Sequence, residues 1–277
     1  MSKTTIGAYG AWATRLGSGK TPLLSLRRDQ FKSISAWRRK ALAKALELIA
    51  PPDLAASSVR VDKRYEYDGL AFEEVSWGLS SGGRTEGVFI KPAGAKGALP
   101  AMLVLHDHGG QKYFGYKKMV RTGARVHPVI EEHQRVYYGD RAWPNELARR
   151  GWVVLVHDGF AFGSRRVLYG DVLDSITGGR REPKESDAAG IEEYNRFAGA
   201  HESVMAKSLF CAGTTWPGVT LAEDQRALDY LVGRKDVDAR RVAACGLSGG
   251  GLRTAYLAGL DMRVKAAVCV GFMSTWR

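Results

Sequence analysis

Four short apolar runs, separated by segments long enough for helices, occupy the chain after residue 100. They lie at residues 102–105, 152–156, 241–246 and 264–270. Strands that are apolar along their whole length are typical of a parallel sheet covered by helices on both faces. The sequence therefore predicts an α/β fold with a mostly parallel sheet. It also predicts helices ending near residue 150 and lying around 222–232 and 252–260.

In the first hundred residues the apolar residues are spaced differently from those of the later part of the chain. Apolar positions spaced three and four residues apart over 31–49 predict an amphipathic helix that ends before Pro51 and Pro52. Residues 63–91 then show the alternation typical of β-strands, with a turn of small residues at 80–83. We therefore expect antiparallel strands ahead of the parallel part of the sheet.

The domain organisation follows from these patterns. Residues 1–29 are rich in Gly, Ser, Thr and Arg without a clear period, and we interpret them as an N-terminal arm. Residues 30–277 are expected to form one domain. Two of its connections, 107–142 and 159–220, are too long for simple crossovers. In open α/β sheets, ligand sites lie beyond the carboxyl ends of the strands, so these insertions are expected to build a pocket there.

Ser248 lies in a Gly-Leu-Ser-Gly-Gly segment between the predicted strand 241–246 and the predicted helix 252–260. A sharp turn in this context lifts a serine above the sheet, and glycines two residues to either side let strand and helix approach. Such a hydroxyl becomes a nucleophile when a base takes its proton. A tight structural turn is the alternative. A second Gly-x-Ser-x-Gly segment, at 78–82, lies between predicted strands, and we interpret it as a turn.

A serine that adds to an ester leaves negative charge on the former carbonyl oxygen, and two backbone N–H groups usually bind that oxygen. One donor belongs to the residue after the nucleophile, which is Gly249. The other comes from the loop after an earlier strand. The segment His106-Asp-His-Gly-Gly110 follows strand 102–105 directly, and its glycines allow close approach to a substrate. We therefore place the second donor at Gly110.

Several histidines lie near this predicted edge of the sheet. His108 belongs to the same loop, and His157 and Asp158 follow strand 152–156. We predict pocket positions for all three residues. His157 is interpreted as a support or substrate contact rather than as the base that activates the serine. No metal-binding residue is predicted.

These stretches resemble the α/β-hydrolase superfamily, and more closely its branch of dienelactone hydrolases and acetyl xylan esterases. The segments that carry the resemblance are 105–110, 157–163, 213–218 and 236–251. The resemblance implies an α/β-hydrolase fold over about residues 30–277. It also implies that Ser248 hydrolyses carboxylic esters of small molecules, with Gly249 and Gly110 as oxyanion donors and without a metal or organic cofactor.

The chain departs from this family after the nucleophile. In this family an aspartate and a histidine follow the serine on further strand–helix units, and Arg277 comes before any such unit. We therefore expect the acid and base beyond Arg277, and slow or absent ester hydrolysis by the chain as given. A catalytically incompetent binding or scaffold protein of the same fold is the alternative. The apolar strand 264–270 would leave a sheet edge uncovered, so self-association is expected.

Composition limits the partners. The formal net charge is +12, but the basic residues occur as scattered doublets, without a basic stripe or a nucleic-acid-binding motif. We therefore expect no nucleic-acid partner. No run of about 18 apolar residues occurs, and the N-terminus lacks the apolar stretch of a leader peptide. Together with three cysteines that cannot all pair, these features predict no membrane partner and a cytoplasmic protein.

Overall fold

The computed structural model describes residues 4, 6–17 and 21–273. Its contacts divide the chain into two compact units, with the boundary after Leu48. The first unit includes η1 (Gly7–Tyr9), α1 (Gly10–Gly17) and nearly all of α2 (Ile34–Ile49), and Met273 is grouped with it. Helix α2 confirms the predicted amphipathic helix, whereas α1 lies in the segment that we expected to be an irregular arm.

The predicted domain boundary after residue 29 differs from this division. Helix α2 groups with the N-terminal residues rather than with the sheet. The physical reason is its weak burial, because Ile49 alone among the residues of α2 is buried.

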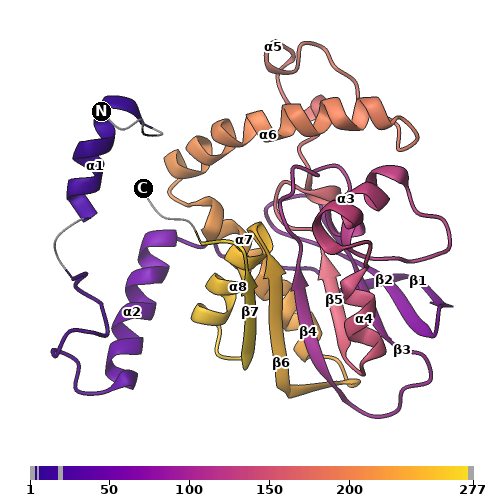
Figure 1. The fold of residues 1–277 in the computed structure, drawn as a ribbon, viewed down its shortest axis with the longest axis horizontal. Coiled ribbons are helices and arrows are strands. Elements are labelled where there is room, and N and C mark those ends of the chain that lie inside the picture. The colour runs from indigo at the N-terminus through magenta and orange to yellow at the C-terminus, as the bar shows by residue number, and fades with distance from the viewer. Residues whose placement is uncertain (1–3, 5, 18–20, 274–277) are drawn as a thin grey trace. The chain divides into compact units, whose positions relative to one another are not determined.

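The second unit contains a seven-stranded sheet with the strand order β1-β2-β3-β5-β4-β6-β7 (Figure 1). Strands β1, β2, β3 and β5 pair antiparallel, whereas β5, β4, β6 and β7 pair parallel. The mixed sheet of the prediction is confirmed. The strands are β1 (Arg60–Tyr67), β2 (Leu70–Gly78), β3 (Arg84–Pro92), β4 (Leu99–Leu105), β5 (Val153–His157), β6 (Val237–Leu247) and β7 (Ala266–Val270).

Both insertions contain helices, and the second is mainly helical. The longest of their helices, α6, has 24 residues but buries only Ile191, Tyr194 and Ala198. So few buried positions leave a weak apolar period, which explains why the sequence did not predict this helix. The helical segments of this unit are η2 (Gly115–Met119), α3 (Pro128–Tyr138), α4 (Trp143–Arg149), η3 (Gly163–Arg165), η4 (Tyr169–Asp171), α5 (Asp174–Thr177), α6 (Ala188–Cys211), α7 (Trp216–Val232) and α8 (Gly249–Leu260).

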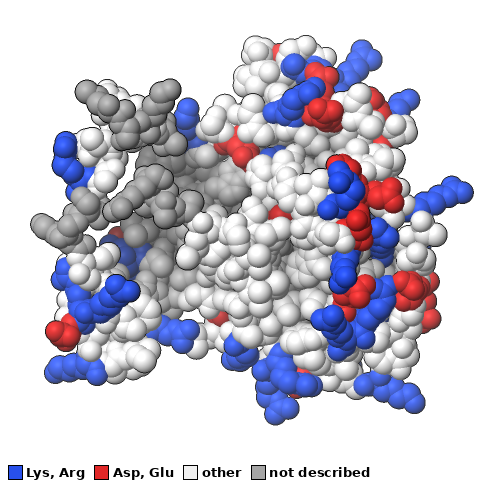
Figure 2. Space-filling model, in the orientation of Figure 1, with Lys and Arg blue, Asp and Glu red and all other residues white. Residues whose placement is uncertain are grey.

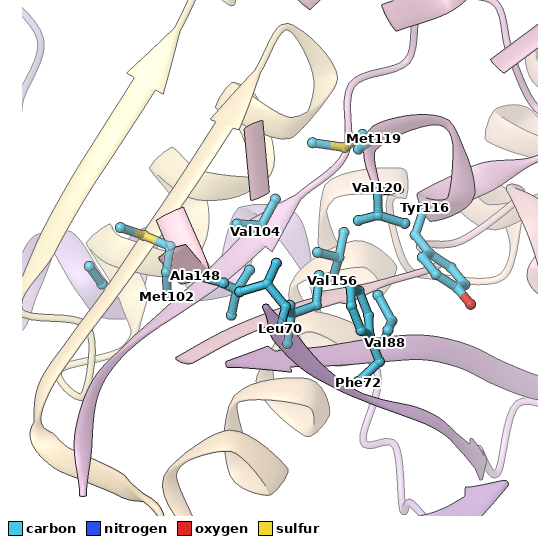
Figure 3. Close-up of a cluster of buried hydrophobic side chains, with 13 residues drawn as sticks. Leu70, Phe72, Val88, Met102, Val104, Tyr116, Met119, Val120, Ala148 and Val156 are labelled. Atoms are coloured by element: carbon cyan, nitrogen blue, oxygen red, sulfur yellow. The ribbon is translucent and has the colours of Figure 1, made fainter. Parts of the chain in front are cut away.

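Helices cover both faces of the central strands. Successive side chains of a strand point to opposite faces, and Met102 and Val104 of β4 share a buried cluster with Ala148 of α4 (Figure 3). The same cluster includes Tyr116 and Met119 of η2. Helices α7 and α8 also contact β4, yet none of their described residues belongs to this cluster. They therefore pack on the opposite face.

Strand β7 is an exposed apolar edge. It is the last strand in the sheet order, and all five of its residues are exposed, with Val268 at 52% and Val270 at 45%. Figure 2 shows few charged side chains where Figure 1 draws β6 and β7, whereas acidic and basic side chains are interspersed at the right-hand margin. Cys269, also on this strand, is exposed as well.

This edge leads to a prediction about self-association. An exposed apolar strand can pair with a second copy of the chain, so the sedimentation coefficient is expected to rise with protein concentration. A charge on the strand opposes such pairing, and Val268→Lys is expected to weaken association about tenfold or more. Val204 of α6 is similarly exposed, at 45%, and Val204→Lys is the matched control. A wild-type chain that sediments as a monomer at all concentrations contradicts the prediction.

Candidate active site

Ser248 occupies a strained turn between β6 and α8. Its φ of 55° and ψ of −117° lie in a region that residues other than glycine rarely adopt, which costs roughly 1–3 kcal/mol. The Ser248 N–H donates a hydrogen bond to the Val270 carbonyl oxygen at 2.8 Å, so the end of β7 holds the turn in place. The side chain is half-buried. The predicted strand, turn and helix around this serine are confirmed.

The glycines around the serine are required by close backbone packing. A side-chain carbon on Gly250 would overlap the Leu105 carbonyl oxygen, and one on Gly246 would overlap the Gly250 backbone. A carbon on Gly251 would lie 2.7 Å from the Val270 oxygen. Helix α8 therefore begins directly against the ends of β4 and β7. These backbone contacts are the physical reason why glycine is needed two residues before and two residues after Ser248.

The loop after β4 approaches the start of α8. A side-chain carbon on Gly249 would lie 3.2 Å from the backbone nitrogen of His108, so these two residues are neighbours. Gly110 lies further along the loop, is exposed, and donates its N–H to Nδ1 of His108 at 3.1 Å. The amide that we predicted as the second oxyanion donor is thus hydrogen-bonded within the loop, whereas the amide beside Gly249 belongs to His108.

A cavity of about 400 Å³ lies beside Gly249 and His108. Much of its wall comes from the second insertion, including Glu202 of α6 and the residues around Phe160 and Trp216. The wall is mainly apolar, and its aromatic side chains are Phe160, Phe162, Trp216 and Tyr256. The predicted pocket residue His108 lines this cavity.

The His108 ring is fixed by hydrogen bonds at both nitrogens. Because Nδ1 accepts from Gly110, Nε2 carries the proton and donates to Glu202 Oε1 at 2.9 Å. Glu202 also pairs with the buried Lys112, whose Nζ lies 3.8 Å from the centre of the Phe162 ring. Burial raises the pKa of Glu202, but the hydrogen bonds from His108 and Lys112 outweigh it and lower that pKa. The ring is therefore a fixed part of the cavity wall.

His157 does not line the cavity, contrary to the prediction. Its ring is fully buried, with Nδ1 2.8 Å from the Asp158 carbonyl oxygen and Nε2 3.1 Å from Asp224 Oδ1. Arg253 of α8 donates two hydrogen bonds to the same aspartate, at 2.5 and 3.1 Å. Burial raises the pKa of Asp224, but the Arg253 charge and the His157 hydrogen bond outweigh it. The pKa is therefore lowered. His157 thus joins the end of β5 to α7 through Asp224 and to α8 through Arg253. It is enclosed there because these helices cover the end of the strand.

Asp158 is also absent from the cavity wall. Its carboxylate accepts hydrogen bonds from the Tyr116 N–H at 2.7 Å, the Ser164 N–H at 2.7 Å and the Ser164 hydroxyl at 2.8 Å. Burial raises the pKa of Asp158 to about 6, and these hydrogen bonds partly oppose the shift. Asp158 therefore ties η2 to η3. The prediction placed it in the pocket because the sequence shows where a strand ends, but not which loops fold over that end.

Ser248 lacks a partner that could take its proton among the residues that the structure describes. Its side chain does not cap α8, and none of the hydrogen bonds of the histidine rings in 21–273 is made to its hydroxyl. The same described residues contain no group of three or more His, Cys, Asp or Glu side chains that could hold a metal ion. No described helix is both long and apolar enough to cross a membrane.

Comparisons with solved structures decide the fold. No family model matches the sequence. A protein of Bacteroides fragilis NCTC 9343, described as a putative acetyl xylan esterase, superimposes with a TM-score of 0.68 and 17% identity. The match covers 96% of this chain and 62% of that protein. The chain has the α/β-hydrolase fold.

A second solved structure agrees with this fold, and one further protein is similar in sequence. A glucuronoyl esterase from Solibacter usitatus superimposes with a TM-score of 0.51 and 16% identity, over 92% of this chain and 64% of that one. In sequence, the chain is 28% identical over 240 residues to a Bacillus subtilis (strain 168) protein named "Putative hydrolase YtaP". That match covers 86% of this chain and 64% of the relative. The chain thus spans less than two thirds of the length of each of these proteins.

Proposed function

We propose that this protein is a serine-dependent carboxylic-ester hydrolase with Ser248 as its nucleophile. The observation that carries the proposal is the strained backbone of Ser248 at the start of α8, beside a cavity that Gly249 and His108 line. Backbone strain of this kind persists where the surrounding structure enforces it and is common at active sites. The similarity to proteins named as a hydrolase and as esterases supports the same chemistry.

The proposed reaction has two steps. Ser248 Oγ attacks the carbonyl carbon of the ester while a base takes the hydroxyl proton, and the carbonyl oxygen becomes negatively charged. The alcohol then leaves with that proton, and water hydrolyses the acyl-serine to a carboxylic acid. We place the two oxyanion donors at the N–H groups of Gly249 and His108. The His108 amide replaces Gly110 in this proposal because the Gly110 amide binds the His108 ring.

The cavity favours a particular kind of ester. Its aromatic side chains, among them Phe160 and Trp216, offer flat apolar surfaces to a substrate. A volume of about 400 Å³ suits a small organic group rather than a polymer segment of several units. We therefore propose a small-molecule ester with one apolar or ring-shaped group that occupies this cavity.

A second candidate function is binding without catalysis. One observation favours it, because the described residues provide no base for the Ser248 hydroxyl. A protein of this kind would bind an ester in the cavity without forming a covalent intermediate.

Covalent labelling separates the two candidates. A fluorophosphonate reacts with an activated serine and leaves a stable phosphonyl group on its oxygen. After prolonged incubation, digestion and mass spectrometry, the added mass is expected on the peptide that contains Ser248, and we expect it to form slowly because the described residues provide no base for the hydroxyl. The binding alternative predicts no added mass at this position under the same conditions. Labelling of other serines but not Ser248 contradicts the proposed nucleophile.

A further inference from the structure

A buried lysine lies behind the loop that carries one of the proposed oxyanion donors. We call residues 107–111 the oxyanion loop. We infer that Lys118 is a positioning residue that orients the backbone amides of the oxyanion loop toward the start of α8. This inference rests on the proposed function, since it concerns the amides that would bind the oxyanion.

Lys118 is held on a rigid support. It belongs to η2, and its side chain is fully buried. Tyr116 and Met119, on either side of it, pack in the buried cluster between the sheet and α4 (Figure 3). The buried Gln134 of α3 donates to the Lys118 carbonyl oxygen at 3.3 Å. The ammonium group therefore extends toward the oxyanion loop from a backbone that is itself fixed.

The ammonium group binds three carbonyl oxygens of this one loop. Lys118 Nζ donates to the carbonyl oxygens of Asp107 at 2.6 Å, His108 at 3.0 Å and Gln111 at 3.3 Å. An ammonium has three protons to donate, so one group can satisfy all three acceptors. Few other side chains could hold three backbone oxygens at one point.

Peptide planarity transmits this arrangement to the amides. In a trans peptide the C=O of one residue and the N–H of the next point in opposite directions. Because Lys118 holds the Asp107 C=O, the His108 N–H must point away from Lys118. The backbone nitrogen of His108 is also the loop atom nearest to a side-chain carbon built on Gly249, at 3.2 Å. Lys118 also binds the His108 C=O, so the N–H of the next residue, Gly109, points away from Lys118 as well.

The charges around Lys118 explain how a buried ammonium is tolerated. Asp107 Oδ2 lies 3.4 Å from Nζ, and α3 adds two further contacts to that carboxylate, from His133 Nε2 at 3.1 Å and from the Tyr138 hydroxyl. Burial lowers the pKa of Lys118 to about 8, while Asp107 acts in the opposite direction. The nearby Lys112 lowers this pKa further, and Asp158 raises it.

A buried ion pair is weak support for stability, because removing both charges from water costs about as much as their attraction returns. An apolar side chain at position 118 would fill the same space without that cost. It could not bind the carbonyl oxygens of the loop, however. The hydrogen bonds to Asp107, His108 and Gln111 therefore point to a role in orienting the loop, beyond that of filling the core.

Lysine substitutions test this role on the full 277-residue chain. Lys118→Met keeps the length of the side chain and removes the donors. Lys117→Met is the matched control, since Lys117 is the adjacent residue of η2 and its side chain is exposed. The double variant Asp107→Asn, Lys118→Met also removes the negative charge that the single change leaves without its ammonium partner. It is used if the single variant fails to fold.

Two quantities are measured on each variant. The first is the rate of fluorophosphonate labelling of Ser248 against probe concentration, which separates probe affinity from the rate of the covalent step. Removal of one oxyanion donor typically slows such a step about 100- to 1,000-fold. We expect a misdirected donor to slow it at least about tenfold with probe affinity unchanged. The second quantity is hydrogen exchange, which is expected to accelerate in the oxyanion loop and to stay unchanged in the β-strands.

The outcomes distinguish the two proposals. If Ser248 of the wild-type chain is not labelled, the proposed function fails, and the role of Lys118 fails with it. If Ser248 is labelled but Lys118→Met matches Lys117→Met in the covalent step, the positioning role alone is wrong. Weaker probe affinity with an unchanged covalent step also contradicts positioning, because a merely structural change of the cavity would have that effect. Unchanged exchange in the loop overturns the inference as well.

Discussion

Ser248→Ala is expected to abolish the phosphonyl adduct and to lower any ester hydrolysis by the chain about 100-fold or more. Alanine lacks the oxygen that forms the covalent bond, and loss of a catalytic serine is among the most damaging changes in serine hydrolases. Because the change removes one oxygen atom from a half-buried side chain, the fold is expected to be retained. Intact-protein mass spectrometry measures the adduct, and release of p-nitrophenol from a p-nitrophenyl ester measures hydrolysis.

Ser80→Ala is the matched control for this experiment. Ser80 lies in the second Gly-x-Ser-x-Gly segment of the chain, where its hydroxyl accepts a hydrogen bond from the Ala55 N–H at 3.0 Å. It follows β2 in an exposed turn. We expect Ser80→Ala to label and hydrolyse like the wild type. An adduct that persists in Ser248→Ala, or disappears in Ser80→Ala, would show that the nucleophile is elsewhere.

Gly250→Ala is expected to destabilise the protein by about 3 kcal/mol or more, or to prevent folding. The added methyl group would overlap the carbonyl oxygen of Leu105 and approach the His106 oxygen to 2.9 Å. Both are backbone atoms at the end of β4, so neither can move aside as a flexible side chain would. Overpacking of a core costs about 1–3 kcal/mol even where side chains adjust. Urea unfolding followed by tryptophan fluorescence measures the change.

Gly259→Ala provides the control in the same helix. A side-chain carbon on Gly259 would have no atom within 4 Å, and the residue is exposed. Alanine forms helices better than glycine, so this change is expected to stabilise the protein by about 0.5–1 kcal/mol. The two substitutions add the same methyl group to α8 with opposite expected effects. Equal free energies of unfolding for both variants would mean that α8 does not pack against β4 as described.

Much of the fold could be predicted because buried strands and helices require apolar residues at regular spacings in the sequence. The central strands are apolar at successive positions over 102–105 and 242–245, and a strand covered on both faces requires that pattern. The turn at Ser248 could be predicted for a similar reason, since Gly246 and Gly250 are required by backbone contacts. Helix α6 could not be predicted in this way, because most of its residues are exposed.

The site could be predicted only in part, because its members come from segments far apart in the chain. Nothing in the sequence distinguishes Lys118 from Lys117, yet one is fully buried beneath the oxyanion loop and the other is exposed. Likewise, Glu202 reaches His108 from α6 across 94 positions. Such contacts depend on how the insertions fold over the sheet, and no local pattern records that.

The sequence by itself determined the central strands, the helices around 31–49, 222–232 and 252–260, and the turn that carries Ser248, because these depend on local periodicity and on the small size of glycine. Only the tertiary structure decided which polar groups meet at that turn. It placed the His108 amide rather than that of Gly110 beside Gly249, and it enclosed His157 and Asp158 away from the cavity. The physical reason is that hydrogen bonds of buried polar groups are satisfied by partners from distant segments.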